Sequence, residues 1–234
     1  MQHPGPGGAP LSRRALLCRG AALGAGALLA GAAGPAAALA DMEPMPETPA
    51  DALTRLAAGN ARFAAGKPEG ARRDLARLRA IADKQTPFAA FLGCADSRVP
   101  IELAYDQGFG DVFVVRVAGN VATAVEIASL EFGTAVLGCE AITVLGHSGC
   151  GAVKAALAGG EVPGQISTLY QHIVPAFDRK GLSLDEAIVA NVRFQVRKLR
   201  TASPVLQRLV ADGKLAITGG VFDIATGRVE PVTV

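Results

Sequence analysis

Short apolar runs alternate with amphipathic segments along most of this chain. Four of the runs, bounded by polar or glycine-rich stretches, have the length and composition of buried strands. They lie at 88–93, 112–117, 141–145 and 215–222. Because the segments between them read largely as helices, the sequence predicts an α/β domain with a parallel-dominated central sheet flanked by helices.

Helical patterns precede the first strand and fill the intervals between strands. Apolar residues recur at helical spacing from residue 50, with Gly59 and Asn60 expected to break the helix, and a second amphipathic stretch covers 71–83. Together these two segments predict an N-terminal helical arm. Residues 121–138 are apolar on most faces, which indicates a helix packed against both the sheet and a partner. Ser183 begins a capping-box sequence, which predicts a helix to about residue 200.

The first forty residues have the pattern of an export signal. Arg13 and Arg14 precede an apolar run at 20–33, and small residues at 38–40 offer a cleavage site before Asp41. That run is shorter than the roughly 18–20 residues that span a bilayer. We therefore expect a twin-arginine signal, a periplasmic or secreted product and no stable membrane span in the mature chain, the alternative being an uncleaved anchor. A proline-rich leader at 41–49 and a single domain at 50–234 would follow.

Charge and cysteine content narrow the class of protein. The chain has 23 basic and 21 acidic side chains, and loss of the signal removes three of the arginines. The remaining domain is nearly neutral. Its charge therefore gives no support for nucleic-acid binding. Of the four cysteines, Cys18 lies in the signal. Since three thiols cannot pair off into a disulfide framework, metal ligation explains Cys94 and Cys150 better, and Cys139 fits a small buried hydrophobe.

Residues that can bind a metal follow two of the predicted strands. Cys94 comes directly after the first run, and His147 and Cys150 come just after the third. Because ligand sites in open parallel sheets lie beyond the carboxyl ends of the strands, the two loops are expected to converge. Two thiolates, one imidazole and an open fourth position are typical of catalytic zinc, whereas structural zinc is normally closed by four ligands. The sequence predicts one zinc ion per subunit.

Asp96 and Arg98 lie on the first of these loops, two and four residues after Cys94. A guanidinium that grips the carboxylate through two hydrogen bonds would hold Asp96 ionised and oriented. The carboxylate could then accept a hydrogen bond from a zinc-bound water. Without Arg98 it could instead become a fourth zinc ligand in a closed state. A simple surface salt bridge is the alternative interpretation.

These loops resemble those of the beta-class carbonic anhydrases, and the resemblance covers residues 56–230. Its motifs are C-A-D-S-R-V-P at 94–100, G-H-S-G-C-G at 146–151, L-x-x-G-N-x-R-F at 56–63, F-V-V-R-x-A-G-N at 113–120 and G-G-V-F-D-I-x-T-G at 219–227. Members of that family are α/β zinc enzymes that interconvert carbon dioxide and bicarbonate as dimers or higher homo-oligomers. The resemblance thus implies a carbonate dehydratase that works through zinc-bound hydroxide, and the N-terminal signal pattern makes it an exported, bacterial-type member.

The resemblance also assigns roles to individual residues. The matching positions are Cys94, His147 and Cys150 as zinc ligands, Asp96 and Arg98 as the catalytic dyad, Gly151 beside the substrate, Gln85 reaching the neighbouring subunit's site and Phe113 as an aromatic wall. Plant-like members have a tyrosine where this chain has Phe132. Carbon dioxide is apolar, so Phe113, Phe132 and Val99 are expected to form a small apolar pocket for it.

Two other functions stay open at this point. Carbonyl sulfide and carbon disulfide are linear molecules that the same zinc hydroxide could attack, so a hydrolase of these substrates would keep the same residues. A non-catalytic zinc-binding module would need Asp96 to close the site permanently. Arg98 argues against that closure because it offers Asp96 a competing partner.

Overall fold

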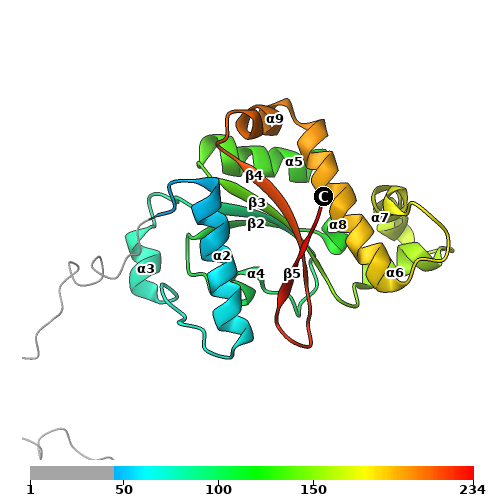
Figure 1. Cartoon of the computed structure of the whole chain (residues 1–234), viewed down its shortest axis with the longest axis horizontal. Helices are drawn as coiled ribbons and strands as arrows, with labels where there is room; N and C mark the ends of the chain where they lie inside the picture. The colour runs from blue at the N-terminus through cyan, green and yellow to red at the C-terminus, as the bar shows by residue number, and fades with distance from the viewer. Residues whose placement is uncertain (1–44) are drawn as a thin grey trace, which may run out of the picture. The chain divides into compact units, whose positions relative to one another are not determined.

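The apolar runs form the strands of one sheet in the computed structural model, which describes residues 45–234 (Figure 1). In this part of the chain the strand order is β2-β1-β3-β4-β5, and all neighbours are parallel except β4 and β5. The predicted α/β class with a parallel-dominated sheet is confirmed. The strands are β1 (Ala89–Gly93), β2 (Val112–Arg116), β3 (Ala141–His147), β4 (Ala216–Phe222) and β5 (Val229–Val232).

Helices cover both faces of the sheet (Figure 1). One face carries α2 and α4, and the other carries α5, α8 and α9. The α-helices are α2 (Pro49–Ala64), α3 (Leu75–Ala80), α4 (Ile101–Ala104), α5 (Ala124–Glu131), α6 (Gly151–Ala158), α7 (Ser167–Ile173), α8 (Leu184–Ala202) and α9 (Pro204–Ala211). Short 3-10 turns lie at Ala118–Asn120, Gly164–Ile166 and Val174–Ala176.

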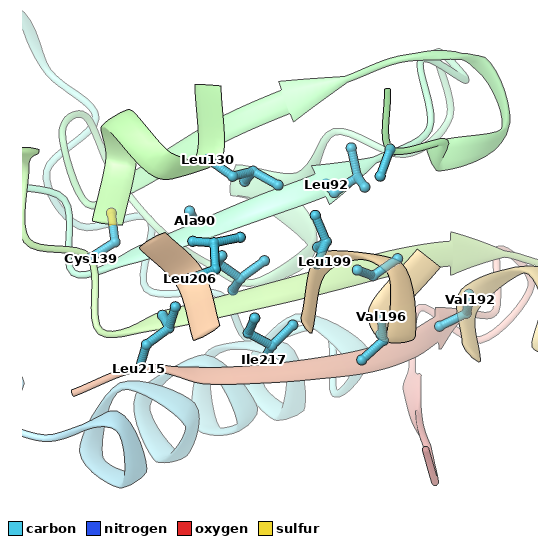
Figure 2. Packing of buried hydrophobic residues seen from close by; sticks show 13 residues of the cluster. Ala90, Leu92, Leu130, Cys139, Val192, Val196, Leu199, Leu206, Leu215 and Ile217 are labelled. Carbon is cyan, nitrogen blue, oxygen red and sulfur yellow. The ribbon is translucent and has the colours of Figure 1, made fainter. Parts of the chain in front are cut away.

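Each face of the sheet buries its own hydrophobic cluster. On the α8 side, Figure 2 shows Leu199 of α8, Leu206 of α9 and Ile217 of β4 in one packed group. On the α2 side, Leu56 packs with Phe91 and other buried residues of β1 and β3. Because β1 and β3 are covered on both faces, all their residues are buried, which explains why they read as continuous apolar runs.

The predicted break at Gly59 and Asn60 is wrong, since α2 continues through both residues. Gly59 is needed for close packing: a Cβ there would lie 2.0 Å from the carbonyl oxygen of Tyr105. Asn60 is buried, and its Nδ2 donates to the carbonyls of Ala104 and Gly227, each at 2.9 Å. Both residues therefore join the helix to distant loops, which a local pattern does not reveal.

Two other predicted helices are shorter than the pattern indicated. Within 71–83 only the six residues of α3 are helical. Within 121–138, α5 begins at Ala124 and passes into a π-helical turn at Phe132–Val136. The prediction at Ser183 is confirmed, because its side chain and that of Glu186 form a reciprocal capping box at the start of α8.

The expected export signal and residues 41–44 of the proline-rich leader lie outside the described residues, and Pro49, the end of that leader, is already the first residue of α2. The described residues form one compact unit. Among their helices, none combines the length and the apolar character that crossing a bilayer requires.

Candidate metal centre

The three candidate ligands meet beyond the carboxyl ends of two neighbouring strands. Cys94 directly follows β1, His147 is the last residue of β3, and Cys150 is the N-cap of α6. Gly93 pairs with Leu145 in the sheet, so β1 and β3 end at nearly the same level. The two loops therefore converge as the sequence predicted.

The geometry of these side chains fits a tetrahedral metal ion. Their ligand atoms all lie within 4.8 Å of one another, and they are the one such group among residues 45–234. The Sγ atoms of Cys94 and Cys150 are 4.0 Å apart. Two sulfurs bound to tetrahedral zinc at about 2.3 Å would be separated by about 3.8 Å. The site needs only a small adjustment to hold zinc.

The imidazole of His147 is oriented for a ligand. Its ring is fully buried, and Nδ1 lies 3.1 Å from the carbonyl oxygen of Ser148. A proton on Nδ1 would donate to that oxygen and leave a lone pair on Nε2, the usual arrangement for a metal-binding histidine. Nε2 is buried and has no hydrogen-bond partner in the described structure. An unsatisfied buried nitrogen facing two sulfurs is explained by an ion between them.

The two thiols lie close enough to interact, with their Sγ atoms 4.0 Å apart. The hydrogen bond from Cys150 holds the pKa of Cys94 well below its ordinary value, although burial opposes this. The same interaction raises the pKa of Cys150, and burial adds to it. The pair thus favours one negative charge, and a metal ion would displace the protons of both sulfurs because cysteine ligands bind as thiolates.

Asp96 is turned toward Arg98. Its Oδ1 accepts from Nε of Arg98 at 2.9 Å and from the backbone N–H of Arg98 at 3.0 Å, while Oδ2 accepts from Nη2 at 2.8 Å. The guanidinium keeps the pKa of Asp96 far below its ordinary value. Asp96 Oδ2 also lies 3.8 Å from His147 Nε2. The carboxylate therefore sits at the edge of the cluster, ionised, and outside the group of mutually close ligand atoms.

Arg116 and Gly119 hold this loop, and sequence reasoning gave neither of them a role. Arg116, the last residue of β2, donates from Nε to the carbonyl of Cys94 at 2.9 Å and from Nη2 to that of Asp96 at 2.6 Å. The backbone N–H of Gly119 donates to Cys94 Sγ at 3.3 Å. Both residues belong to the family motif at 113–120, which could have marked them as functional. Their contacts with the Cys94 loop could not be predicted, because they depend on the pairing of β2 with β1.

Gly151 lies beside the cluster, and Val99 does not face it. Gly151 is exposed at the first residue of α6, and a Cβ added there would meet no atom within 4 Å. Space therefore adjoins Cys150 on this side. Val99 is fully buried and packs with Phe91 and Ile101 in the cluster on the α2 side of the sheet. The structure does not bring Val99 to the opening.

The two phenylalanines pack together, away from this chain's own cluster. Their ring centroids are 6.4 Å apart, and Phe132 is 47% exposed. Phe113 pairs with Ala90 in the sheet, four residues before Cys94. At about 3.3 Å per residue this places Phe113 roughly 13 Å back along the strand. Gln85 is exposed in the loop that enters the opposite end of β1.

Comparisons with known proteins point to one family. A family model described as carbonic anhydrase matches residues 89–229. The chain is 40% identical over 190 residues to a carbonic anhydrase of Mycolicibacterium smegmatis, covering 78% of this chain and 92% of that protein. It is 39% identical over 193 residues to carbonic anhydrase 2 of Mycobacterium tuberculosis, covering 79% and 93%.

The solved structures agree with the sequence comparisons. A tetrameric beta-carbonic anhydrase from the ascomycete Sordaria macrospora superposes with a TM-score of 0.61 at 26% identity, over 67% of this chain and 86% of that one. The beta-carbonic anhydrase of Coccomyxa, solved with acetazolamide, gives a TM-score of 0.61 at 28% identity, over 77% and 81%.

Proposed function

This chain belongs to the carbonic anhydrase family, and we propose that it interconverts carbon dioxide and bicarbonate with a zinc ion held by Cys94, His147 and Cys150. The observation that carries this proposal is the buried cluster of the three ligand atoms, all within 4.8 Å of one another, with the Asp96–Arg98 pair at its edge. Zinc in such a site acts as a Lewis acid that lowers the pKa of a bound water, so that a nucleophile is available near neutral pH.

Asp96 orients the nucleophile in this proposal. Because Arg98 keeps it ionised, the carboxylate can only accept hydrogen bonds, and it lies 3.8 Å from His147 Nε2, next to the space between the ligands. A fixed acceptor at that position would accept a hydrogen bond from the nucleophile and so orient it toward carbon dioxide. Arg98 has the further role of occupying both carboxylate oxygens of Asp96, so that Asp96 would not become a fourth ligand of a zinc ion held by the other three residues.

The substrate would approach from the side of Gly151. No atom lies within 4 Å of a Cβ built on this glycine, which directly follows Cys150, whereas Cys94, His147 and Cys150 are themselves buried. Carbon dioxide is small and apolar, so it needs space and little hydrogen bonding. A side chain at position 151 would occupy the space that the substrate requires.

We also propose that the active enzyme is a homodimer or a higher homo-oligomer. β2 is an edge strand of the sheet, and Val125, Phe132 and Val136 beside it expose large apolar areas. Gln85, Phe113 and Phe132 lie away from their own chain's cluster, so they would complete the site of a neighbour. Activity per subunit should then fall on dilution as the oligomer dissociates. Constant specific activity in monomeric protein would contradict this assembly.

Export by the twin-arginine route is the third part of the proposal. It rests on Arg13 and Arg14 and on the apolar run after them. Folding before export would allow the two thiolates to bind zinc in a reducing compartment. Replacing both arginines by lysine should leave unprocessed enzyme inside the cell, with the unaltered chain in the periplasm. Equal distribution of the two proteins after fractionation would contradict the proposed route.

The function is tested by measuring carbon dioxide hydration and zinc content on one sample of residues 41–234. We expect one zinc per chain and rapid hydration, with slower turnover of carbonyl sulfide. A higher rate on carbonyl sulfide would favour the hydrolase, and bound zinc without either activity would favour the non-catalytic module.

A further inference from the structure

We propose that Asn191 of α8 is a positioning residue for the metal centre, acting through the peptide groups of Gly119 on the sulfur of Cys94. This inference rests on the proposed zinc function, because the sulfur matters as a ligand. Asn191 itself touches neither the metal position nor the substrate space. It lies on a helix that the sequence motifs of the two zinc loops do not include.

Gly119 links the ligand to the helix. Its N–H donates to Cys94 Sγ at 3.3 Å, and its carbonyl accepts from Asn191 Nδ2 at 2.9 Å. Gly119 has a φ of 76°, in the left-handed region, and a Cβ there would lie 2.8 Å from Ile173 Cδ1. The turn is therefore closely packed, and its orientation is fixed by the sulfur on one side and by Asn191 on the other.

Gln195, one helical turn further along α8, fixes the orientation of Asn191. Its Nε2 donates to Asn191 Oδ1 at 3.0 Å and to the carbonyl of His172 at 2.9 Å, while its Oε1 accepts from the N–H of Ala122 at 3.0 Å. Asn191 is 1% exposed and Gln195 is fully buried. A flipped Asn191 amide would set its oxygen against the Gly119 carbonyl and its NH₂ against Nε2 of Gln195. Only one orientation satisfies the network.

This network has a chemical consequence at the thiolate. An N–H that donates to a ligand sulfur withdraws charge from it and fixes the direction of its lone pairs, and both effects change how strongly the sulfur donates to a metal. Groups that orient metal ligands in this way typically change metal affinity by about 10–100-fold. Since Asn191 acts one residue further from the metal, we expect the lower end of that range.

The test compares Asn191→Leu with Asn60→Leu. Asn60 is the matched control because it is also buried, donates to two backbone carbonyls and accepts from the N–H of Val229, but lies on α2. Each protein, as residues 41–234, is loaded with cobalt(II) to record the thiolate-to-metal charge-transfer absorption. Zinc affinity is then measured by competition with a chelator, and thermal unfolding is followed in parallel.

We expect Asn191→Leu to shift the charge-transfer band and to weaken zinc binding about 10-fold. Asn60→Leu should lower the melting temperature at least as much, because it loses three hydrogen bonds, while the band and the affinity stay those of the unaltered protein. Unchanged band and affinity in Asn191→Leu would overturn the inference, as would equal shifts in both variants.

A second variant keeps the test decisive if Asn191→Leu does not fold. In Gln195→Met the new side chain has a similar length but cannot donate to Asn191 Oδ1. This variant should shift the charge-transfer band in the same direction by a smaller amount. A folded Gln195→Met protein with unaltered band and affinity would then reject the inference. If the unaltered protein takes up cobalt without any thiolate charge-transfer band, the proposed function itself fails, which is a separate outcome.

Discussion

Replacing Asp106 by asparagine is expected to lower the free energy of unfolding by about 3–5 kcal/mol at neutral pH. Asp106 fixes the N-terminal arm to the loop before β2, and its carboxylate is fully buried. It accepts from Arg62 Nε at 2.7 Å, from Arg73 Nη2 at 2.9 Å and from the backbone N–H groups of Glu69 and Gly70 at 2.9 and 3.0 Å.

The magnitude follows from the loss of charge at unchanged shape. Asparagine can keep the backbone of Asp106, whose φ is 51°, because both residues tolerate the left-handed region. The variant leaves Arg62 and Arg73 facing a neutral amide, and breaking a buried ion pair on one side typically costs about 3–5 kcal/mol. We expect the lower part of this range, because the two arginine side chains are 30% and 27% exposed and Arg62 Nε also lies 3.4 Å from Glu69 Oε1. For a domain of this size the melting temperature should fall by about 6–20 °C. The exposed Asp83, replaced by asparagine, is the control.

The effect must also depend on pH. Burial alone would raise the pKa of Asp106, but Arg62 and the two backbone N–H groups outweigh burial and hold it below its ordinary value. The stabilisation is therefore complete above the unfolded pKa of about 4 and is lost as the pH falls through the folded value. Thermal unfolding at pH 7 and at a pH below the folded value should show the two melting temperatures converging in acid. A difference that is negligible at pH 7, or equal at both pH values, would refute the reasoning.

The other predictions concern the metal centre and the packing of α2. Asp96→Asn should retain zinc and lower kcat/KM for carbon dioxide hydration by at least about 100-fold, since the amide cannot replace an ionised acceptor; unchanged turnover would exclude Asp96 from the mechanism. Gly59→Ala should destabilise the protein by about 1–3 kcal/mol in denaturant titrations, despite the better helix propensity of alanine, because the new Cβ would lie 2.0 Å from the Tyr105 oxygen. Removing zinc with a chelator should lower the melting temperature, and added zinc should restore it in proportion to the logarithm of its concentration; identical melting curves in both conditions would show that no tight metal site exists.

The strands and the three candidate ligands could be predicted because their causes are local. β1 and β3 are buried on both faces, so each reads as an unbroken apolar run, and the polar residues that end each run mark the edge of the sheet. Cys94, His147 and Cys150 occupy that edge because the strand ends put them there. Nothing distant in the chain is needed to place each ligand at the end of a strand, whereas their meeting in one cluster also needs β1 and β3 to be neighbours.

The contacts that could not be predicted join residues far apart in the sequence. Asp106 pairs with arginines 33 and 44 positions away, and Asn191 bonds to Gly119 across 72 positions. Gly59 shows the same limitation, since its role is to admit the carbonyl of Tyr105 and not to end a helix. The distance of Phe113 from the zinc ligands of its own chain also could not be predicted, because it depends on the register of β2 against β1. That register pairs Phe113 with Ala90, four residues before Cys94.

The position of the candidate metal centre follows from the strand order. From β1 the chain moves outward to β2 and then returns across β1 to β3, so the connections after β1 and β3 lead to opposite faces of the sheet. The loop after β1 enters α4 on the α2 side, and the loop after β3 enters α6, which packs against α8 on the other. Connections that separate in this way leave a crevice between neighbouring strand ends, where sheets of this kind bind ligands. Cys94 lies on one side of that crevice, and His147 and Cys150 lie on the other. The ligand cluster therefore depends on β1 and β3 being neighbours, and changes that disturb this pairing should abolish metal binding even if all three ligands are retained.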